Sequence, residues 1–310
     1  MSDRGHLDAL VIVAGFSGLY QLICLRDRLG LSVKVLEAAP DLGGTWYWNR
    51  YPGARCDSES HSYCYFFSRE LLEEWRWSER YPGPPEILRY LNHVATKFDL
   101  RRDIHFNTRV TAAHYDENQW HVLTESGERY SVRYLITAVG CLSAANVPRI
   151  PGLETFAGRW YHTGQWPREG VEFRGKRVAQ IGTGSTGIQM APVIAETAGH
   201  LTVFQRTAQY SVPARNAPLA AEFLQYVREH HDEIKDVVRS TPNGHPFRIS
   251  RRKAFEVSDA EREEIYTAAW EKGGLQFRAS FYDMLLDKKA NDTAGAFIKR
   301  KIRELSLIHI

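Results

Sequence analysis

The chain has 310 residues, of which 43% are hydrophobic and 25% are charged, with 40 Lys and Arg against 37 Asp and Glu. This composition excludes a disordered or fibrous protein, and at about 150 residues per domain the length predicts two domains. The formal charge of +3 does not indicate nucleic acid or an anionic membrane as a partner. The sequence also has no apolar run near 18 residues, so no membrane-spanning helix is expected.

The four cysteines, Cys24, Cys56, Cys64 and Cys141, form no C-x-x-C pair. Neither a zinc site nor a dithiol redox centre is therefore expected, and no other metal site is indicated. The first residues also lack the layout of a signal peptide. Free thiols without an export signal predict a cytoplasmic protein.

The chain opens with a strand–helix–strand pattern, which predicts a doubly wound α/β fold of the Rossmann type. Apolar residues form a strand at 7–13, recur with helical spacing over 17–29, and form a second strand at 32–36. Residues 41–81 are rich in Gly, Pro, Trp and Tyr and have no clear period, which fits either a functional segment or a packed surface excursion. A helix at 85–98 and an antiparallel meander between 110 and 139 are expected next.

A second strand–helix–strand pattern begins at residue 176 and closes at Phe204, and the chain is largely helical after Pro218. Ser258 with Glu261 predicts a capped helix toward Trp270, and further helices are expected at 275–286 and 294–304. The expected organisation is a first nucleotide-binding domain at 1–150, the first part of a second at 151–215, a helical insertion at 216–304 and a non-native tail at 305–310.

The second pattern contains the spacing G-x-G-x-x-G between a strand and a helix, which predicts a pyrophosphate site at the helix N-terminus. A plain glycine-rich turn is the alternative. Arg206 ends the following strand, where a guanidinium favours a 2′-phosphate and so NADP over NAD; a solvated arginine is the alternative. The residues expected to bind NADP are Gly182, Gly184, Ser185, Thr186, Gly187, Arg206 and Thr207.

The first pattern reads Val13-Ala-Gly15-Phe16-Ser17-Gly18, with Val13 in the place of the first glycine. Glu37 ends the next strand 22 residues after Gly15, close to the spacing of a ribose-binding acid. This site is expected to take an unphosphorylated ribose, as in FAD or NAD. Val13 conflicts with the pattern, so that either the turn adapts, flavin affinity falls, or the residue is a reading error. Two such sites suit FAD and NADPH, and without a dithiol the remaining chemistry is oxygenation or a diaphorase-like activity.

Between the two patterns lies Phe156-Ala-Gly158-Arg-Trp-Tyr-His162-Thr-Gly-Gln-Trp166-Pro167. This segment resembles the F-x-G-x-x-x-H-x-x-x-W-P fingerprint of the Baeyer–Villiger monooxygenases, and nearly the whole chain is similar to the group that oxidises phenylacetone, steroids and cyclohexanone. The resemblance implies that Gly44, Thr45 and Trp46 form a second flavin-contacting segment, beside Gly15, Phe16, Ser17, Gly18 and Glu37. It also implies that Asp57 lies near the flavin and orients an active-site arginine, and that His162 acts in proton transfer or in a hinge between the domains.

The function implied by the resemblance is oxygen insertion next to a ketone carbonyl, through a C4a-peroxyflavin, with FAD, NADPH and O2. An N- or S-oxygenating flavin monooxygenase and an inactive nucleotide-binding fragment are the alternatives. Family members are longer, and the segment with their active-site arginine has no match here, so the sequence resembles an N-terminal fragment that is expected to be inactive alone. Residues 305–310 resemble a translated sequencing adapter. The ketone and the oligomeric state are left open.

Overall fold

The computed structural model describes residues 7–305. The chain divides into two compact units, each built from two stretches of sequence. The first unit comprises Met1–Ala54 with Pro84–Glu172, and the second comprises Arg55–Gly83 with Phe173–Ile310. The irregular stretch expected at 41–81 is therefore shared between the two units.

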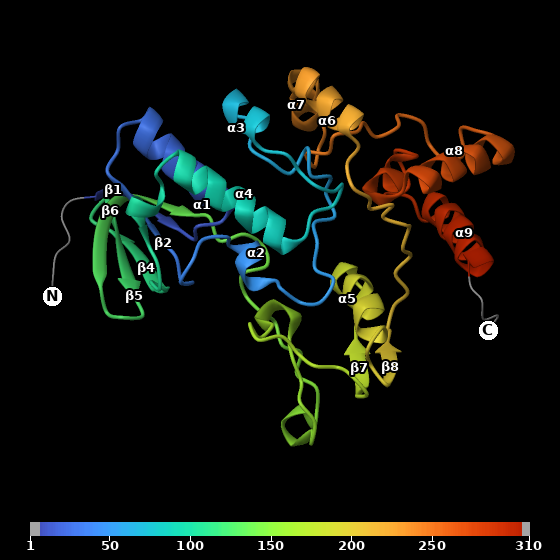
Figure 1. Cartoon of the computed structure of the whole chain (residues 1–310), viewed down its shortest axis with the longest axis horizontal. Helices are drawn as coiled ribbons and strands as arrows, with labels where there is room; N and C mark the ends of the chain where they lie inside the picture. Colours follow the sequence, from blue (N-terminus) through green and yellow to red (C-terminus); the bar gives the residue numbers. More distant parts are fainter. Residues whose placement is uncertain (1–6, 306–310) are drawn as a thin grey trace. The chain divides into compact units, whose positions relative to one another are not determined.

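The first unit contains a six-stranded mixed sheet (Figure 1). Its strands are β1 (Leu7–Ile12), β2 (Val33–Leu36), β3 (Ile104–His105), β4 (Val110–Asp116), β5 (Gln119–Thr124) and β6 (Arg129–Thr137). The order is β3-β2-β1-β6-β5-β4, in which β3, β2, β1 and β6 are parallel and β6, β5 and β4 form an antiparallel meander. The α/β class and the meander predicted from the sequence are confirmed.

Helices of the first unit are α1 (Phe16–Ile23), α2 (Thr45–Trp48) and α4 (Pro84–Lys97). Helix α1 packs on β1 and β2 and continues as a π-helical turn at Cys24–Arg28. Helix α4 lies beside α1 (Figure 1), with the Tyr90 and Phe16 rings 6.0 Å apart. Successive side chains of β1 point to opposite faces, so Val11 approaches α1 at Gly18 while Leu10 packs with β2, β5 and β6.

The second unit has a parallel pair of strands, β7 (Arg177–Ile181) and β8 (His200–Phe204), joined by α5 (Ser185–Ala195). This arrangement confirms the second strand–helix–strand pattern. Its other helices are α3 (Arg69–Glu74), α6 (Ala221–Glu229), α7 (His231–Ser240), α8 (Asp259–Lys272) and α9 (Lys288–Leu305). Helix α9 ends at Leu305, and residues 306–310 of the expected tail lie outside the described residues.

An aromatic core holds the helical part of this unit together, and it includes Tyr266, Trp270, Phe277, Phe281 and Phe297. The predicted cap is confirmed, because the Ser258 hydroxyl accepts a hydrogen bond from the Glu261 N–H at 3.2 Å.

The helix expected at 275–286 is wrong. The structure has a 3-10 helix at Gly274–Ala279, followed by turns. Gly273 and Gly274 both have positive φ, and the Ser280 hydroxyl donates to the Phe277 carbonyl at 2.7 Å. These local turns place Phe277 and Phe281 in the core without an α-helix, because Ser side chains and glycines favour turn conformations over helix interiors.

A partly buried ion pair between Glu59 and Arg80 anchors the stretch at 55–83, because both residues also bond to the segment at 272–276. The Glu59 carboxylate accepts hydrogen bonds from Arg80 Nε at 2.9 Å and from Gln276 Nε2 at 3.1 Å. Arg80 also donates to the Lys272 carbonyl at 2.7 Å. The bonds from Arg80 to Lys272 and from Gln276 to Glu59 therefore join sequence segments 192 and 217 residues apart.

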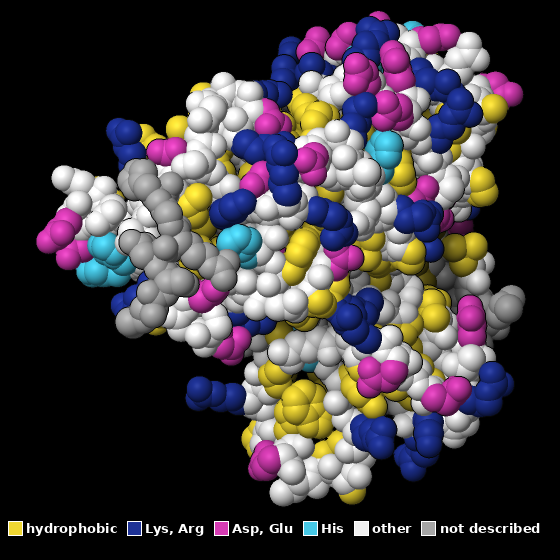
Figure 2. Space-filling model, turned by 60° about the vertical axis from the view of Figure 1, so that its left-hand side comes forward, with side chains coloured by type: hydrophobic (Ala, Val, Ile, Leu, Met, Phe, Trp, Pro, Cys, Tyr) yellow, Lys and Arg dark blue, Asp and Glu magenta, His cyan; other side chains and the backbone are white. Residues whose placement is uncertain are grey.

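The charges of the described residues are mixed on the surface. On the face drawn in Figure 2, Lys and Arg side chains lie interspersed with Asp and Glu. Within residues 7–305, the structure contains no helix that combines the length and the apolar character needed to cross a membrane.

We expect the substitution Arg80→Met to lower the free energy of unfolding of the second unit by about 3 kcal/mol, because it leaves the buried Glu59 carboxylate without its cationic partner. Urea unfolding followed by tryptophan fluorescence measures this change. The control is Arg69→Met, which removes the exposed pair with Glu73 and is expected to cost under about 0.5 kcal/mol. Equal losses in the two variants would contradict the role of the Arg80 pair.

Candidate nucleotide-binding and active sites

The first glycine-rich turn joins the end of β1 to the start of α1. A Cβ on Gly18 would lie 1.9 Å from the Val13 carbonyl oxygen, so only glycine allows the helix to approach the strand this closely. Gly15 precedes the helix in an extended conformation, Phe16 is half-buried and Ser17 is exposed. The turn thus presents the N-terminus of α1, a site suited to a pyrophosphate.

The segment at 43–46 lies directly against this turn. The Gly43 N–H donates to the Ala14 carbonyl at 2.9 Å, and a Cβ on Gly44 would lie 2.9 Å from the Gly15 Cα. Thr45 and the buried Trp46 follow in α2. The structure therefore brings together Gly15, Gly18, Gly44, Thr45 and Trp46, which the sequence assigns to flavin binding from two separate motifs.

Glu37 follows β2, at the edge where the ribose-binding acid is expected, and it is almost fully buried. Its two carboxylate oxygens accept hydrogen bonds from the Ala14 N–H at 2.7 Å and from the Ala39 N–H at 2.8 Å. Burial raises the pKa of the Glu37 carboxyl, and the neighbouring backbone donors, with Ala39 and Ala14 foremost, partly oppose this shift. Glu37 thus holds the glycine turn itself through hydrogen bonds from backbone N–H groups on both sides of the strand end.

Val13 adopts a φ of 82°, in the region that β-branched residues rarely occupy. The turn therefore keeps the conformation that a glycine would favour, at the expense of backbone strain in Val13. The turn itself is therefore not changed by Val13, and a lower flavin affinity or a reading error at this position stays a prediction.

The second glycine-rich turn has the same geometry between β7 and α5. Gly182 has a φ of 105°, and a Cβ on Gly187 would lie 2.4 Å from the Gly182 carbonyl oxygen. A Cβ on Gly182 or Gly184 would meet no described atom within 4 Å, so the backbone there faces open space. Ser185 and Thr186 begin α5. Open space above exposed backbone N–H groups is the cradle that a pyrophosphate needs.

Gln180 stabilises this second turn, although it lies outside the motifs that predict the site. Its buried side-chain amide donates to the carbonyls of Gly182 and Gly187, at 3.0 and 3.1 Å. The available signal was a polar residue inside the otherwise apolar run Val178–Ile181, two positions before the first glycine.

Arg206 and Thr207 follow β8 and are exposed. The neighbouring Gln205 side chain donates to the Thr183 hydroxyl at 2.9 Å, which ties the end of β8 to the glycine turn. The structure therefore places Arg206, the residue expected to bind the 2′-phosphate, next to Gln205, which contacts the turn.

The fingerprint segment at 156–167 belongs to the first unit. His162 is half-buried, and its Nδ1 accepts a hydrogen bond from the Gly164 N–H at 3.2 Å, capping a short 3-10 turn. This contact is local to the motif. Beyond it, Arg168 stacks on the Tyr47 ring at 4.7 Å, which fastens the segment to the helix that carries Thr45 and Trp46.

Asp57 belongs to the second unit and is exposed. His245 of the same unit lies within electrostatic reach of Asp57, accepts a hydrogen bond from Arg278, and has a pKa lowered mainly by burial. The adjacent Cys56 is buried, which raises the pKa of its thiol to about 12 and makes it a poor nucleophile. Among these groups, Asp57 is the charged side chain open to a ligand.

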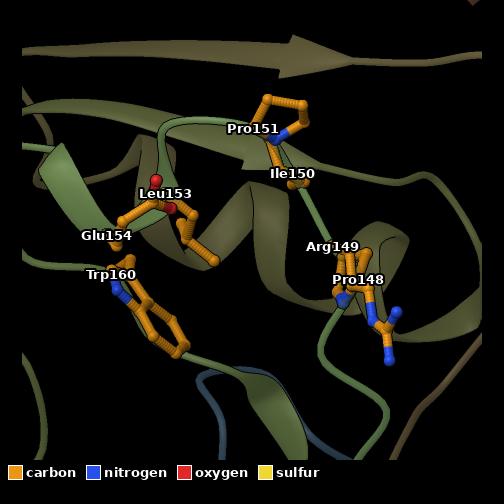
Figure 3. Close-up of a pocket in the computed structure, with 7 residues that line it drawn as sticks. All are labelled: Pro148, Arg149, Ile150, Pro151, Leu153, Glu154 and Trp160. Carbon is orange, nitrogen blue, oxygen red and sulfur yellow. The ribbon is translucent and has the colours of Figure 1, made fainter.

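A separate open pocket of about 410 Å³ lies in the connecting segment of the first unit (Figure 3). Leu153, Glu154 and Trp160 line one side, and the stretch at 148–151 lines the other. It contains none of the expected site residues. Among residues 7–305, no cluster of His, Cys, Asp or Glu is arranged to hold a metal ion.

Comparison with known proteins identifies the family. The model of the flavin-binding monooxygenase-like family matches residues 8–216. The chain belongs to this family. It is 47% identical over 303 residues to a Baeyer–Villiger monooxygenase of Pseudooceanicola batsensis, covering 96% of this chain and 55% of the relative. The family resemblance expected from the fingerprint is confirmed.

Two further relatives indicate how broad the family is. The chain is 42% identical to the phenazine N-monooxygenase PhzNO1 of Lysobacter antibioticus, over 98% of this chain and 57% of the relative. It also superposes on an oxidised steroid monooxygenase bound to NADP with a TM-score of 0.92 and 49% identity, over 98% of this chain and 58% of that one. The chain thus spans little more than half the length of the family members it matches.

We expect Val13→Gly to stabilise the first unit by about 1 kcal/mol, because relief of roughly 2 kcal/mol of strain exceeds the entropy that glycine loses on folding. Thermal unfolding measures the change. Val13→Ala keeps a Cβ at positive φ and is expected to recover less than half of the gain. A Val13→Gly variant no more stable than the parent would contradict the strain.

Proposed function

We propose that the protein carrying this sequence is an FAD- and NADPH-dependent Baeyer–Villiger monooxygenase. The observation that supports this most directly is the fingerprint at 156–167 between two glycine turns of the same geometry. The turn at Gly15, with Glu37 and the segment at 44–46, would hold FAD. The turn at Gly182, with Arg206, would hold NADPH. When bound, the nicotinamide supplies a hydride and the flavin activates O2, which supplies the inserted oxygen.

The residues of the chain then have distinct tasks. The backbone N–H groups at the starts of α1 and α5 neutralise the two pyrophosphates. Glu37 fixes the first turn and accepts a ribose hydroxyl, and Arg206 selects the 2′-phosphate. Asp57 would orient a cationic group toward the negative charge that develops during oxygen transfer. His162 orders the fingerprint segment through its bond to Gly164.

The proposed substrates are a ketone and O2, and the proposed products an ester or lactone and water. The relative that oxidises a phenazine nitrogen shows why amines and sulfides must be tested beside ketones.

The activity is proposed for the whole protein. In the 310-residue chain Ile181 and Phe204, at the ends of β7 and β8, are 69% and 56% exposed. Parallel sheets are ordinarily covered on both faces, so we expect this chain alone to bind nucleotide without oxygenating ketones.

Product analysis tests the proposal. The whole protein, loaded with FAD and supplied with NADPH and O2, is given cyclic and aryl ketones, an amine and a sulfide in parallel. Ester or lactone formation from a ketone supports the Baeyer–Villiger assignment. An N-oxide or sulfoxide without any ester assigns the N- or S-oxygenating class, and nucleotide binding without oxygen consumption leaves a binding protein.

We expect Asp57→Asn, measured in the whole protein, to lower ester formation about 100-fold while FAD remains bound, because the amide cannot hold a cation as the carboxylate does. The ester formed per NADPH consumed is the measurement. The matched control is Asp232→Asn, at an exposed position of α7. Unchanged ester formation in Asp57→Asn would exclude the role of Asp57.

We expect Arg206→Gln to reduce the preference for NADP over NAD about 30-fold, because a charge-assisted bond to a phosphate contributes roughly 2 kcal/mol. Titration of the 310-residue chain with each nucleotide gives the two dissociation constants. Arg228→Gln, which removes an exposed charge from α6, is the control. If Arg206→Gln weakens NAD and NADP binding equally, Arg206 does not read the 2′-phosphate.

A further inference from the structure

One side chain of the second unit joins the helix of the glycine turn to the segment that carries Asp57. Gln189 lies on α5, just after Gly187 and Ile188. Its Nε2 donates to the Arg55 carbonyl at 3.0 Å, and its Oε1 accepts from the Arg55 N–H at 3.4 Å. The side-chain amide therefore contacts both polar groups of one peptide residue, as a neighbouring strand would.

Arg55 lies two residues before Asp57, and other bonds fix it from the opposite direction. Its guanidinium donates to the Tyr81 carbonyl at 2.7 Å and to the Glu79 carboxylate at 3.1 Å. The next residue, Cys56, donates its backbone N–H to the Pro82 carbonyl at 2.9 Å. The backbone leading into Asp57 is thus fixed on two sides, and Gln189 provides the connection to α5.

The start of α5 is also the part of the second unit that would receive the pyrophosphate. Gly184 precedes the helix, and its carbonyl accepts the first helical bond, from the Ile188 N–H at 3.0 Å. Gln189 follows directly, at the start of the second turn. A nucleotide that orders or shifts the start of α5 therefore moves the Gln189 backbone with it, because a hydrogen-bonded helical turn moves as one body.

We propose that Gln189 is a positioning residue, which transmits occupation of the NADP turn to the orientation of Asp57. This proposal rests on the proposed function, because it takes NADP as the ligand of the Gly182 turn and Asp57 as a residue of the active site. The coupling passes through two directional hydrogen bonds to the Arg55 backbone and requires no contact between Gln189 and the nucleotide.

Amide hydrogen exchange of the 310-residue chain tests this coupling, with a peptide that covers residues 54–60. In the parent chain, NADP is expected to slow exchange in this peptide. In Gln189→Met, which keeps the length of the side chain without its polar atoms, exchange without nucleotide is expected to be about tenfold faster. NADP is then expected to bind within about threefold of the parent affinity without slowing exchange in the peptide.

Two further variants keep the test specific. Gln189→Glu can still accept from the Arg55 N–H but cannot donate to the Arg55 carbonyl, so an intermediate exchange rate is expected. Gln225→Met removes an amide from an exposed face of α6, where it bonds Glu229, and is expected to change nothing in the 54–60 peptide.

The outcomes separate this inference from the proposed function. Suppose that the parent chain binds NADP, and that the 54–60 peptide of Gln189→Met shows the parent's exchange rate both without and with NADP. The positioning role of Gln189 is then overturned. The same holds if NADP binds the parent without slowing exchange. If the parent binds no NADP, the proposed nucleotide site fails and the coupling fails with it, whatever the exchange rates without nucleotide.

Discussion

The close approach of a helix to the strand before it governs both nucleotide-binding turns. In each turn, a Cβ at the third glycine position of the motif would collide with the carbonyl oxygen of the residue that directly follows the strand. The distance would be 1.9 Å from Gly18 to the Val13 oxygen and 2.4 Å from Gly187 to the Gly182 oxygen. That approach forces the residue at the first position of the motif into positive φ. Gly182 adopts this conformation freely, whereas Val13 adopts it under strain.

The two turns are stabilised by different means. In the second, Gln180 donates to two carbonyls of the turn, at Gly182 and Gly187. The corresponding position of the first turn is Val11, which has no polar group, and there the Glu37 carboxylate accepts from the Ala14 N–H instead. The acid that the sequence marks as a ribose ligand is therefore also the residue that holds the strained turn. Because Glu37 and Val13 act on the same turn, the stability of the first unit and the nucleotide binding proposed for it would depend on one short segment.

The features that could be predicted from the sequence are those with a local pattern. Short apolar runs predicted β1, β2 and β7, and the glycine spacing predicted both turns. Each of these features depends on residues that are neighbours in sequence, so a local pattern indicates it. The spacing of Phe277, Phe281 and Met284 also looks helical, yet the glycines at 273 and 274 begin a 3-10 helix and turns that bury these residues differently. A hydrophobic period alone does not distinguish these two ways of filling a core.

No local sequence pattern indicates how the chain divides into its two units. Asp57 follows the two flavin-like motifs closely in sequence. Long-range bonds from Arg80 to Glu59 and Lys272, and from Gln189 to Arg55, nevertheless place it in the unit that carries the second glycine turn. Each of these bonds joins residues that share no sequence period, so the polar partners could be recognised only in the folded chain. The consequence is chemical: under the proposed function, the carboxylate that would orient charge during oxygen transfer is hydrogen-bonded, through Arg55 and Gln189, to the helix that would bind NADP.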